Sequence, residues 1–177
     1  MLSGKLKRPR NMTASHEHYL RAIWAVQSRR GYARLTDVAR ELGIAPPTLS
    51  LGIKALEARS LVTHDDHRFL LLTEAGERVA REVHHRFAVT HAFLHGVLGI
   101  PERLAREEAC RLEHDMSPDT AARLVDLLKL LREDEEFREL FERRFAEYQR
   151  DCRVPADCST CDLACLFPTQ AGREPQS

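Results

Sequence analysis

The sequence predicts a mainly α-helical protein that begins with a winged helix-turn-helix and continues as a helical domain. Three observations predict this fold class. Apolar residues recur at helical spacing through most of the chain, a glycine-containing turn near residue 43 separates two short helices, and two apolar runs flank a polar turn at 64–67. With 177 residues, of which 43 % are hydrophobic, the chain is long enough to bury a core.

Caps and breakers define the expected helices. Thr13 or Ser15 can cap the first helix, and Gly31 ends it. Thr36 is expected to cap the second helix, and Pro46 suits the first turn of the third. The first helix is expected to reach about residue 29, and the others to cover 37–42, 46–59, 74–98, 101–114, 117–132 and 134–150.

A two-stranded wing is expected between the third and fourth helices. The apolar runs at 61–63 and 69–73 flank a polar tip at 64–67, which is the pattern of a β-hairpin. A helix-turn-helix followed by such a hairpin is a winged helix.

The formal net charge of zero hides an asymmetry between the two halves of the chain. Residues 1–75 hold 12 basic and 7 acidic side chains, whereas residues 76–177 hold 15 basic and 20 acidic ones. An excess of positive charge on one half indicates contact with nucleic acid. We therefore expect double-stranded DNA as a partner of the N-terminal half.

The second helix of a helix-turn-helix brings its N-terminal residues to base edges in the major groove. Thr48 and Ser50 offer short hydroxyls there, and Leu51 can contact a thymine methyl group. The candidate DNA-binding residues are Arg34, Pro47, Thr48, Ser50, Leu51 and Lys54. The alternative is an ordinary surface, because helix-turn-helix patterns also occur in proteins that do not bind DNA.

Three segments show a resemblance to a known family. Residues 15–23, 72–76 and especially 108–117 resemble the diphtheria-toxin-repressor and manganese-transport-regulator family. The resemblance implies a homodimeric repressor that binds operator DNA when a divalent iron or manganese ion (Fe2+ or Mn2+) occupies a site between two domains. It implies a winged-helix DNA-binding domain at 1–75 and a helical dimerisation and metal-binding domain at 76–150. The cysteine-containing tail at 151–177 is not part of the family pattern and is expected to be an addition to it.

The metal chemistry is carried by Cys110, Glu113 and His114, which stand at i, i+3 and i+4 and are expected to share one helical face. A thiolate, a carboxylate and an imidazole form a mixed donor set suited to Fe(II), Mn(II), Co(II) or Zn(II). The resemblance implies a further ligand from the first helix, His18. The alternative is a relic site whose side chains are tied up in hydrogen bonds.

Three positions depart from the family pattern. Phe87 stands where the family has a ligand histidine, His91 where it has the partner carboxylate, and Arg21 where manganese-type members have a glutamate. An arginine repels a nearby cation. A second metal site is therefore expected to be lost, unless His91, His84 or His95 rebuilds one; the alternative for these histidines is a solvated or DNA-proximal face.

The tail holds four cysteines within 14 residues: Cys152, Cys158, Cys161 and Cys165. Four thiolates without a histidine suit a [4Fe-4S] or [2Fe-2S] cluster, or a structural zinc ion, and free or redox-active thiols are the third alternative. An iron–sulfur cluster in this tail would take over part of the sensing function.

Several function classes are excluded or disfavoured. The apolar runs are too short to span a bilayer and no apolar segment follows the basic N-terminus, so a cytoplasmic protein without a membrane partner is expected. Phosphate loops, nucleophile elbows and H-E-x-x-H motifs are missing from the sequence, so neither an enzyme nor a small organic substrate is expected. The alternative function is a metallochaperone or iron–sulfur handling protein that uses its winged helix for docking.

Overall fold

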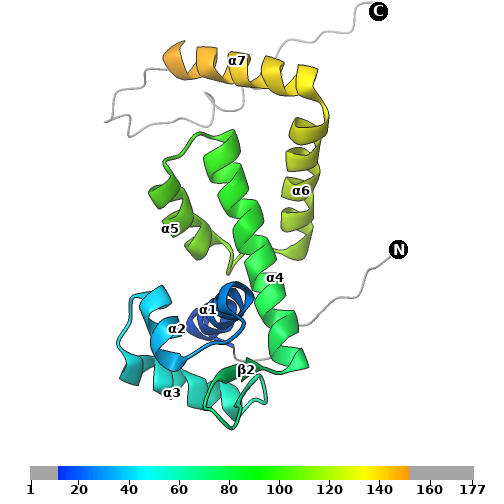
Figure 1. Ribbon diagram of the computed structural model, residues 1–177. Helices are drawn as coiled ribbons and strands as arrows, with labels where there is room; N and C mark the ends of the chain where they lie inside the picture. Colours follow the sequence, from blue (N-terminus) through cyan, green and yellow to red (C-terminus); the bar gives the residue numbers. More distant parts are fainter. Residues whose placement is uncertain (1–11, 152–177) are drawn as a thin grey trace, which may run out of the picture. The chain divides into compact units, whose positions relative to one another are not determined.

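The computed structural model describes residues 12–151 and confirms the predicted fold class (Figure 1). The chain divides into two units, one extending to Lys129 and the other beginning at Leu130. The elements are α1 Ala14–Arg30, α2 Leu35–Leu42, α3 Pro46–Glu57, β1 Val62–His64, β2 Leu70–Leu72, α4 Glu74–His91, the π-helix η1 Ala92–Val97, α5 Glu102–Leu112, α6 Pro118–Glu133 and α7 Glu135–Asp151. Within residues 12–151, none of the helices combines the length and the apolar character needed to cross a membrane.

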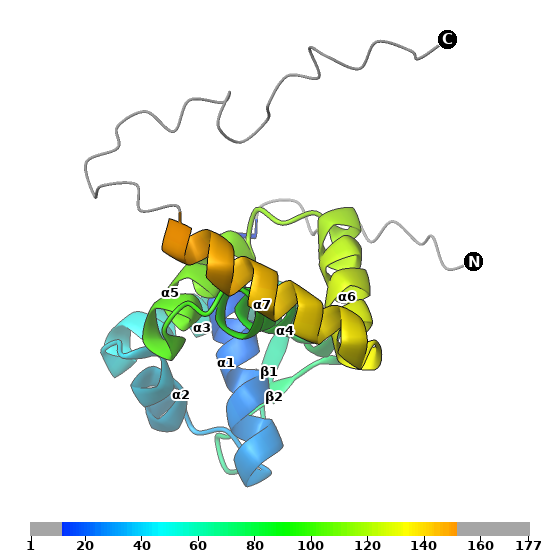
Figure 2. The same ribbon diagram turned by 90° about the horizontal axis from the view of Figure 1, so that it is seen from above.

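Helix α1 lies at the centre of the winged helix, packed against α2, α3, α4 and β2 (Figure 2). Thr13 caps it by accepting the backbone N–H of His16, and Gly31 ends it with φ of 80°. Leu20 and Ile23 are fully buried on its inner face. These residues belong to the main hydrophobic core. Their burial orients α1 so that its polar side faces away from this core.

The helix-turn-helix consists of α2, a turn at Gly43, and α3. Gly43 has φ of 65°, a conformation that glycine adopts without strain. The predicted Thr36 cap is wrong, because α2 begins at Leu35 and Arg34 is its N-cap residue, whose side chain makes no capping hydrogen bond. The predicted inner stripe of α3, which comprises Leu49, Ile53 and Leu56, is confirmed as buried.

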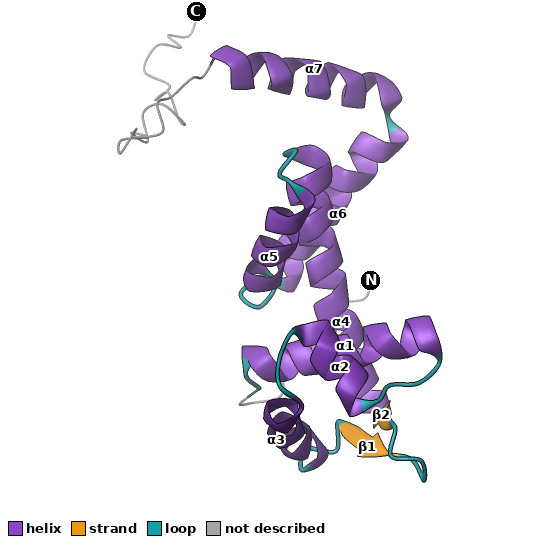
Figure 3. Cartoon of the chain, turned by 60° about the vertical axis from the view of Figure 1, so that its left-hand side comes forward, coloured by secondary structure: helices purple, strands orange, loops and turns teal. Residues whose placement is uncertain are grey.

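The wing is an antiparallel pair in which Val62 faces Leu72 and His64 faces Leu70 (Figure 3). The Asp65 carboxylate shapes its tip by accepting the backbone N–H groups of His67 and Phe69. On the inner side, Gln27 of α1 donates to the carbonyl of Leu70 at 3.0 Å. The wing is therefore tied to the same helix that anchors the core.

The predicted helix over 74–98 is confirmed to residue 97, but its last part is a π-helix. The α-helix ends at His91, and a π-helical segment continues to Val97. The backbone N–H of Leu98 donates to the carbonyl of Phe93, five residues earlier in the chain. This spacing is the hydrogen-bond pattern of a π-helix. This segment brings Leu94 into a second hydrophobic cluster around Phe87.

The C-terminal helices begin as their caps predict. Ser117 accepts the backbone N–H of Thr120 at the start of α6, and Asp134 accepts that of Phe137 at the start of α7. In the unit from Leu130 onward, Phe137 and Leu140 are partly exposed, with 37 % and 42 % of their surface accessible.

Candidate metal centre

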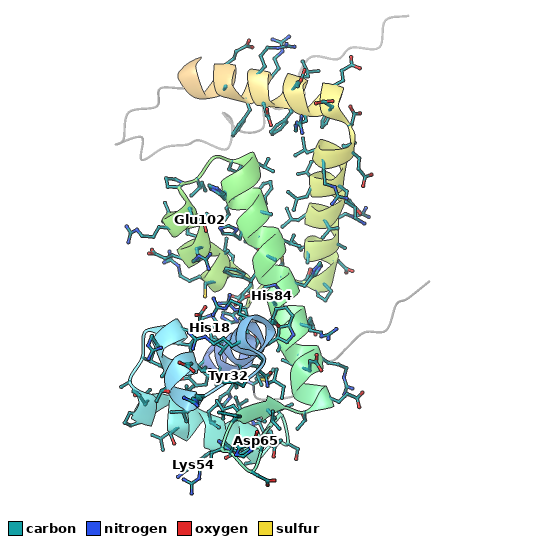
Figure 4. All side chains as sticks on the ribbon, in the orientation of Figure 1. His18, Tyr32, Lys54, Asp65, His84 and Glu102 are labelled. Carbon is teal, nitrogen blue, oxygen red and sulfur yellow. The ribbon has the colours of Figure 1, made fainter. Side chains whose placement is uncertain are left out.

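Three of the side chains predicted as metal ligands, His18, Cys110 and Glu113, meet at the C-terminal end of α5, and the fourth, His114, contacts His18, which is labelled in Figure 4. The His18 Nε2 atom lies 3.0 Å from Cys110 Sγ, 2.9 Å from His114 Nε2 and 3.5 Å from Glu113 Oε1. Ligand atoms of His18, Cys110 and Glu113 all lie within 4.8 Å of one another. Among the described residues, this is the one group of three or more such side chains that meets this limit.

Two elements position these side chains. His18 projects from the polar face of α1, and Cys110 lies in the last turn of α5. The predicted shared helical face needs one correction, because α5 ends at Leu112 and His114 follows its C-cap residue. Glu113 keeps helical backbone angles, with φ of −57° and ψ of −32°, so its side chain still follows the i, i+3 geometry from Cys110.

The chemistry of this cluster fits a divalent transition metal. Glu113 is fully buried, and within residues 12–151 neither of its carboxylate oxygens has a hydrogen-bond partner. A buried carboxylate without hydrogen bonds is costly unless a positive charge compensates it. One thiolate, two imidazoles and one carboxylate are donors that suit iron, cobalt or zinc. His18, Cys110, Glu113 and His114 would therefore hold the ion.

Two buried charged residues outside the predicted set support the cluster. The Glu17 carboxylate lies 2.8 Å from His114 Nδ1, which leaves His114 Nε2 directed at His18. The second residue is Arg86, whose guanidinium lies 3.7 Å from the Glu17 carboxylate. Arg86 also donates to the backbone carbonyl of Glu113 at 3.0 Å and to the Glu82 carboxylate at 2.6 Å. A carboxylate that orients a ligand histidine is a common feature of protein metal sites.

Neither Glu17 nor Arg86 was predicted from the sequence. One signal was available for Glu17, which stands three residues before the core residue Leu20 and so lies on the buried face of α1. An acidic residue on an apolar stripe needs a partner. Arg86 has a comparable position in α4, three residues after the buried Val83.

The three departures from the family pattern form contacts of their own. The Arg21 guanidinium stacks on the Phe87 ring, with its central carbon 4.1 Å from the ring centre. The guanidinium also lies 3.2 Å from Cys110 Sγ. His91 stacks on the Phe87 ring one turn further along α4 and contacts Glu102 at 3.0 Å.

The remaining histidines of α4 and η1 do not join the cluster. The His84 ring lies against the Trp24 ring in a tilted contact, with the ring centres 4.5 Å apart, and burial, followed by the charge of Arg21, lowers the pKa of His84. His95 Nε2 lies 3.7 Å from the same Glu102 oxygen that His91 contacts, and its Nδ1 contacts the carbonyl of Ile100. The rebuilt second site stays a hypothesis from the sequence.

A cleft of about 560 Å³ opens beside the cluster between α1, α2, α4 and α5. His18, Arg21 and Cys110 line it together with the aromatic rings of Trp24 and Phe87. Solvent and ions therefore reach the ligand atoms of His18 and Cys110 from this side, while Glu113 closes the inner side.

The affinity of this centre for metal is expected to increase with pH. The hydrogen bond to Cys110, and then the Glu113 carboxylate, raise the pKa of His18 from 6.5 to about 9. A metal ion binds neutral imidazole, so His18 must first lose its proton. Below the pKa of His18, we expect affinity for Co2+ to rise about tenfold per pH unit.

This pH dependence is measured with a chain whose tail cysteines are all replaced (Cys152→Ser, Cys158→Ser, Cys161→Ser and Cys165→Ser), called the tail-serine chain below. Its thiolate-to-cobalt absorption then reports Cys110 alone. A His18→Ala variant is expected to lose the part of the slope that comes from the His18 proton, and a slope equal to that of the parent would contradict the prediction. The raised pKa of His18 also stabilises the metal-free fold below pH 6.5, and that contribution is lost as pH rises through about 9.

The predicted DNA-binding residues lie on one end of the winged helix. Pro47, Thr48, Leu51 and Lys54 are exposed along α3, and Ser50 is half-buried. Leu51 is 71 % exposed, a large value for an apolar side chain. Lys54 extends from the outer side of α3 (Figure 4). Arg34 lies beside the wing, 5.5 Å from the rings of Tyr32 and Phe69.

The four cysteines of the tail, Cys152, Cys158, Cys161 and Cys165, lie outside the described residues. The cluster, zinc and free-thiol alternatives for the tail therefore stay predictions from their spacing.

Comparison with known proteins gives matches along most of the chain. Residues 11–70 match the model of the iron dependent repressor, N-terminal DNA binding domain, and residues 73–139 match that of the iron dependent repressor, metal binding and dimerisation domain. The HTH-type transcriptional regulator MntR of Bacillus subtilis is 26 % identical over 123 residues, which cover 70 % of this chain and 86 % of that protein. MntR of Geobacillus kaustophilus is 27 % identical over 123 residues, with the same coverage.

Solved structures show the same architecture. The manganese regulator SloR is 28 % identical with a TM-score of 0.60, over 67 % of this chain and 55 % of that one. IdeR of T. acidophilum is 26 % identical with a TM-score of 0.59, over 68 % of this chain and 56 % of that one. The chain thus spans little more than half the length of these solved relatives.

The fold and these matches define a winged-helix protein of the class found in metal-dependent transcriptional regulators. Within that class, the chain belongs to the iron-dependent repressor family, the family of the diphtheria-toxin-repressor and manganese-transport-regulator proteins that its sequence motifs indicated.

Proposed function

We propose that this protein is a metal-dependent transcriptional repressor whose DNA binding is controlled by one divalent ion at the His18–Cys110 centre. The observation that supports this most directly is the meeting of His18 with Cys110 and Glu113. His18 belongs to the central helix of the winged helix, whereas the other two belong to the end of α5. Ligation would therefore couple the DNA-binding end of the protein to its metal-binding segment.

The bound ion would supply positive charge beside the buried Glu113 carboxylate, whose two oxygens have no hydrogen-bond partner among the described residues. Glu113 closes the inner side of the centre, and Glu17 keeps His114 in the orientation that directs Nε2 inward. Helix α1, which holds His18, also packs against α3 and bonds to the wing through Gln27. A change in the position of α1 would thus reach the recognition helix directly.

For the DNA contact, we propose that α3 enters the major groove of double-stranded operator DNA. The supporting features are the exposed N-terminal turn of α3 and the position of Arg34 beside the wing. We place the winged-helix domain at 1–75 and the metal-binding and dimerisation domain at 76–150. A homodimer would present two recognition helices to two half-sites, and the partly exposed Phe137 and Leu140 are suited to a subunit interface.

For the metal, we propose Fe2+ or Mn2+ as the physiological ion, with zinc as the alternative. Related proteins are described as a manganese regulator and as a manganese-dependent repressor in complex with manganese. Another relative, ScaR, is described with bound Zn2+. In this chain, the Cys110 thiolate favours softer ions than an all-oxygen set would. An iron–sulfur cluster in the tail remains our proposal from the cysteine spacing.

The proposal is tested by selecting bound sequences from a random double-stranded DNA pool with the full chain, with and without Fe2+, Mn2+ or Zn2+, followed by footprinting. We expect sequence-specific protection that requires one of these ions and is removed by a chelator. Protection that is equal with and without metal would contradict metal control. Absence of any specific protection would favour the metallochaperone alternative.

Lys54 is expected to bind a DNA phosphate in this complex. Replacing Lys54→Ala should reduce the slope of log affinity against log salt concentration by about one for each phosphate that is no longer neutralised, and so by about two in a dimer. Lys129→Ala is the matched control, since Lys129 is also exposed but belongs to α6. Equal salt slopes for the two variants would contradict phosphate binding by Lys54.

A further inference from the structure

The Arg21 guanidinium lies directly beside two ligand residues of the candidate metal centre. Arg21 lies three residues after His18, on the same face of α1. Its terminal NH2 group is 3.2 Å from Cys110 Sγ, and its Nε is 3.6 Å from Glu113 Oε1. The guanidinium carbon is 4.1 Å from the centre of the Phe87 ring. Contacts from α4 and from the end of α5 therefore hold this cation against two of the four donor atoms.

These contacts leave Arg21 incompletely paired. Its side chain is only 17 % exposed, and its buried Nε has no hydrogen-bond partner in the described part of the chain. Both oxygens of Glu113 likewise lack hydrogen bonds there, although the two groups are close. An ordinary buried ion pair satisfies its donors and acceptors. Here the stacking on Phe87 fixes the guanidinium near the carboxylate but not in bonding geometry, which leaves Glu113 able to accept another cation.

The positive charge of the Arg21 guanidinium limits the number of ions that the candidate metal centre can bind. Cys110 and Glu113 provide at most two negative charges, and a single divalent ion compensates both. A second ion that shared these donors from the α4 side would meet the guanidinium and the Phe87 ring, which offers no ligand atom. The space and the charge that a second ion requires are already taken by Arg21.

We propose that Arg21, held on Phe87, is a built-in cation that limits this centre to one divalent ion and lowers the affinity for that ion. This inference rests on the proposed metal centre. Any incoming ion must compete with the guanidinium for Cys110 and Glu113. The guanidinium charge opposes every divalent ion at this position alike, so its removal is expected to raise their affinities by similar factors.

Cobalt titration of the tail-serine chain tests this inference. Thiolate-to-cobalt absorption gives the affinity, and equilibrium dialysis gives the number of ions per chain. We expect one Co2+ per chain in the parent. Arg21→Met, which keeps an apolar stem on Phe87 but removes the charge, is expected to bind Co2+ at least about tenfold tighter. Mn2+ affinity, followed by electron paramagnetic resonance, should increase by a similar factor.

Arg29→Met is the matched control. Arg29 also lies on α1 and also lines the cleft, but it pairs with Glu41 at 2.6 Å and has no contact with the four donors recorded in the described structure. Its replacement should leave the affinity for Co2+ unchanged. A combined Arg21→Glu and Phe87→His variant, which places ligand residues at both positions, is expected to bind two ions per chain.

The outcomes separate this inference from the proposed function. A parent chain without the thiolate-to-cobalt band would refute the metal centre and the inference with it. If the parent chain binds Co2+ and a folded Arg21→Met variant binds Co2+ with the same affinity, the inference is overturned but the metal centre is not. Binding of two ions per chain by the parent would also overturn the inference alone. If Arg21→Met does not fold, Arg21→Gln decides, because it also removes the positive charge while keeping a polar side chain at this position. Tighter binding than the parent supports the inference, and equal binding overturns it.

Discussion

Replacing Glu113→Gln is expected to weaken the binding of Fe2+, Co2+ or Zn2+ by at least about 100-fold, because residues that only orient a ligand already contribute about 10–100-fold. Glu113 is fully buried, and both of its oxygens are without hydrogen bonds among the described residues. The amide has nearly the same shape but no negative charge, so the packing around it is retained while the charge that attracts the ion is removed. We expect metal-dependent DNA binding to disappear with it.

Glu107→Gln provides the matched comparison. It is the same chemical change in α5, the helix that ends just before Glu113, but the Glu107 side chain is 53 % exposed and pairs with Arg103 at 3.3 Å. Isothermal titration with metal and DNA footprinting should show the parent behaviour for Glu107→Gln and the loss for Glu113→Gln. Equal metal affinity in the two variants would rule out Glu113 as a ligand.

Replacing Arg86→Met is expected to lower the free energy of unfolding of the metal-free protein by about 3–5 kcal/mol, the usual cost of removing one partner from a buried charged network. Arg86 is only 4 % exposed and contacts the Glu17 carboxylate, the Glu82 carboxylate and the Glu113 carbonyl. Without it, the buried Glu17 loses a compensating charge. The orientation of His114 depends on Glu17, so metal affinity should fall as well.

Arg78→Met separates this effect from the loss of any arginine on α4. Arg78 also pairs with a glutamate four residues earlier, Glu74, but its side chain is 56 % exposed. Exposed pairs of this kind contribute little, so the loss should stay within about 0.5 kcal/mol. Urea denaturation of both variants measures the difference. Similar losses for Arg78→Met and Arg86→Met would show that burial of Arg86 has no special role.

Local features of the fold were predictable because they depend on residues close in the chain. Thr13, Ser117 and Asp134 each cap a helix through the backbone N–H group three residues further on. The polar turn at 64–67 determined the position of the wing in the same local way. The prediction for Thr36 failed because α2 begins one residue earlier, at Leu35. The N-terminal end of α2 has no side-chain cap, and it is packed into the core through the buried residues Val38 and Ala39.

The composition of the candidate centre was predictable only in part. The spacing of Cys110, Glu113 and His114 indicated a shared face, and the family resemblance added His18. Neither spacing nor resemblance indicated that Glu17 would orient His114, or that Arg86 would lie buried behind both. These contacts join residues about 70 to 97 positions apart, and such pairs are created by the packing of α1 on α4 and of α4 on α5.

The sequence by itself determined the helical periodicity, the caps, the wing and the residue types that can bind a metal, because each of these depends on neighbours within a few positions. Only the tertiary structure decided which charges meet. It buried Glu113 away from hydrogen-bond donors of the described chain, placed Arg21 on the Phe87 ring, and brought His18 to the end of α5. The physical reason is that the energy of a charge depends on burial and on distances of a few ångströms, and packing between distant segments sets both.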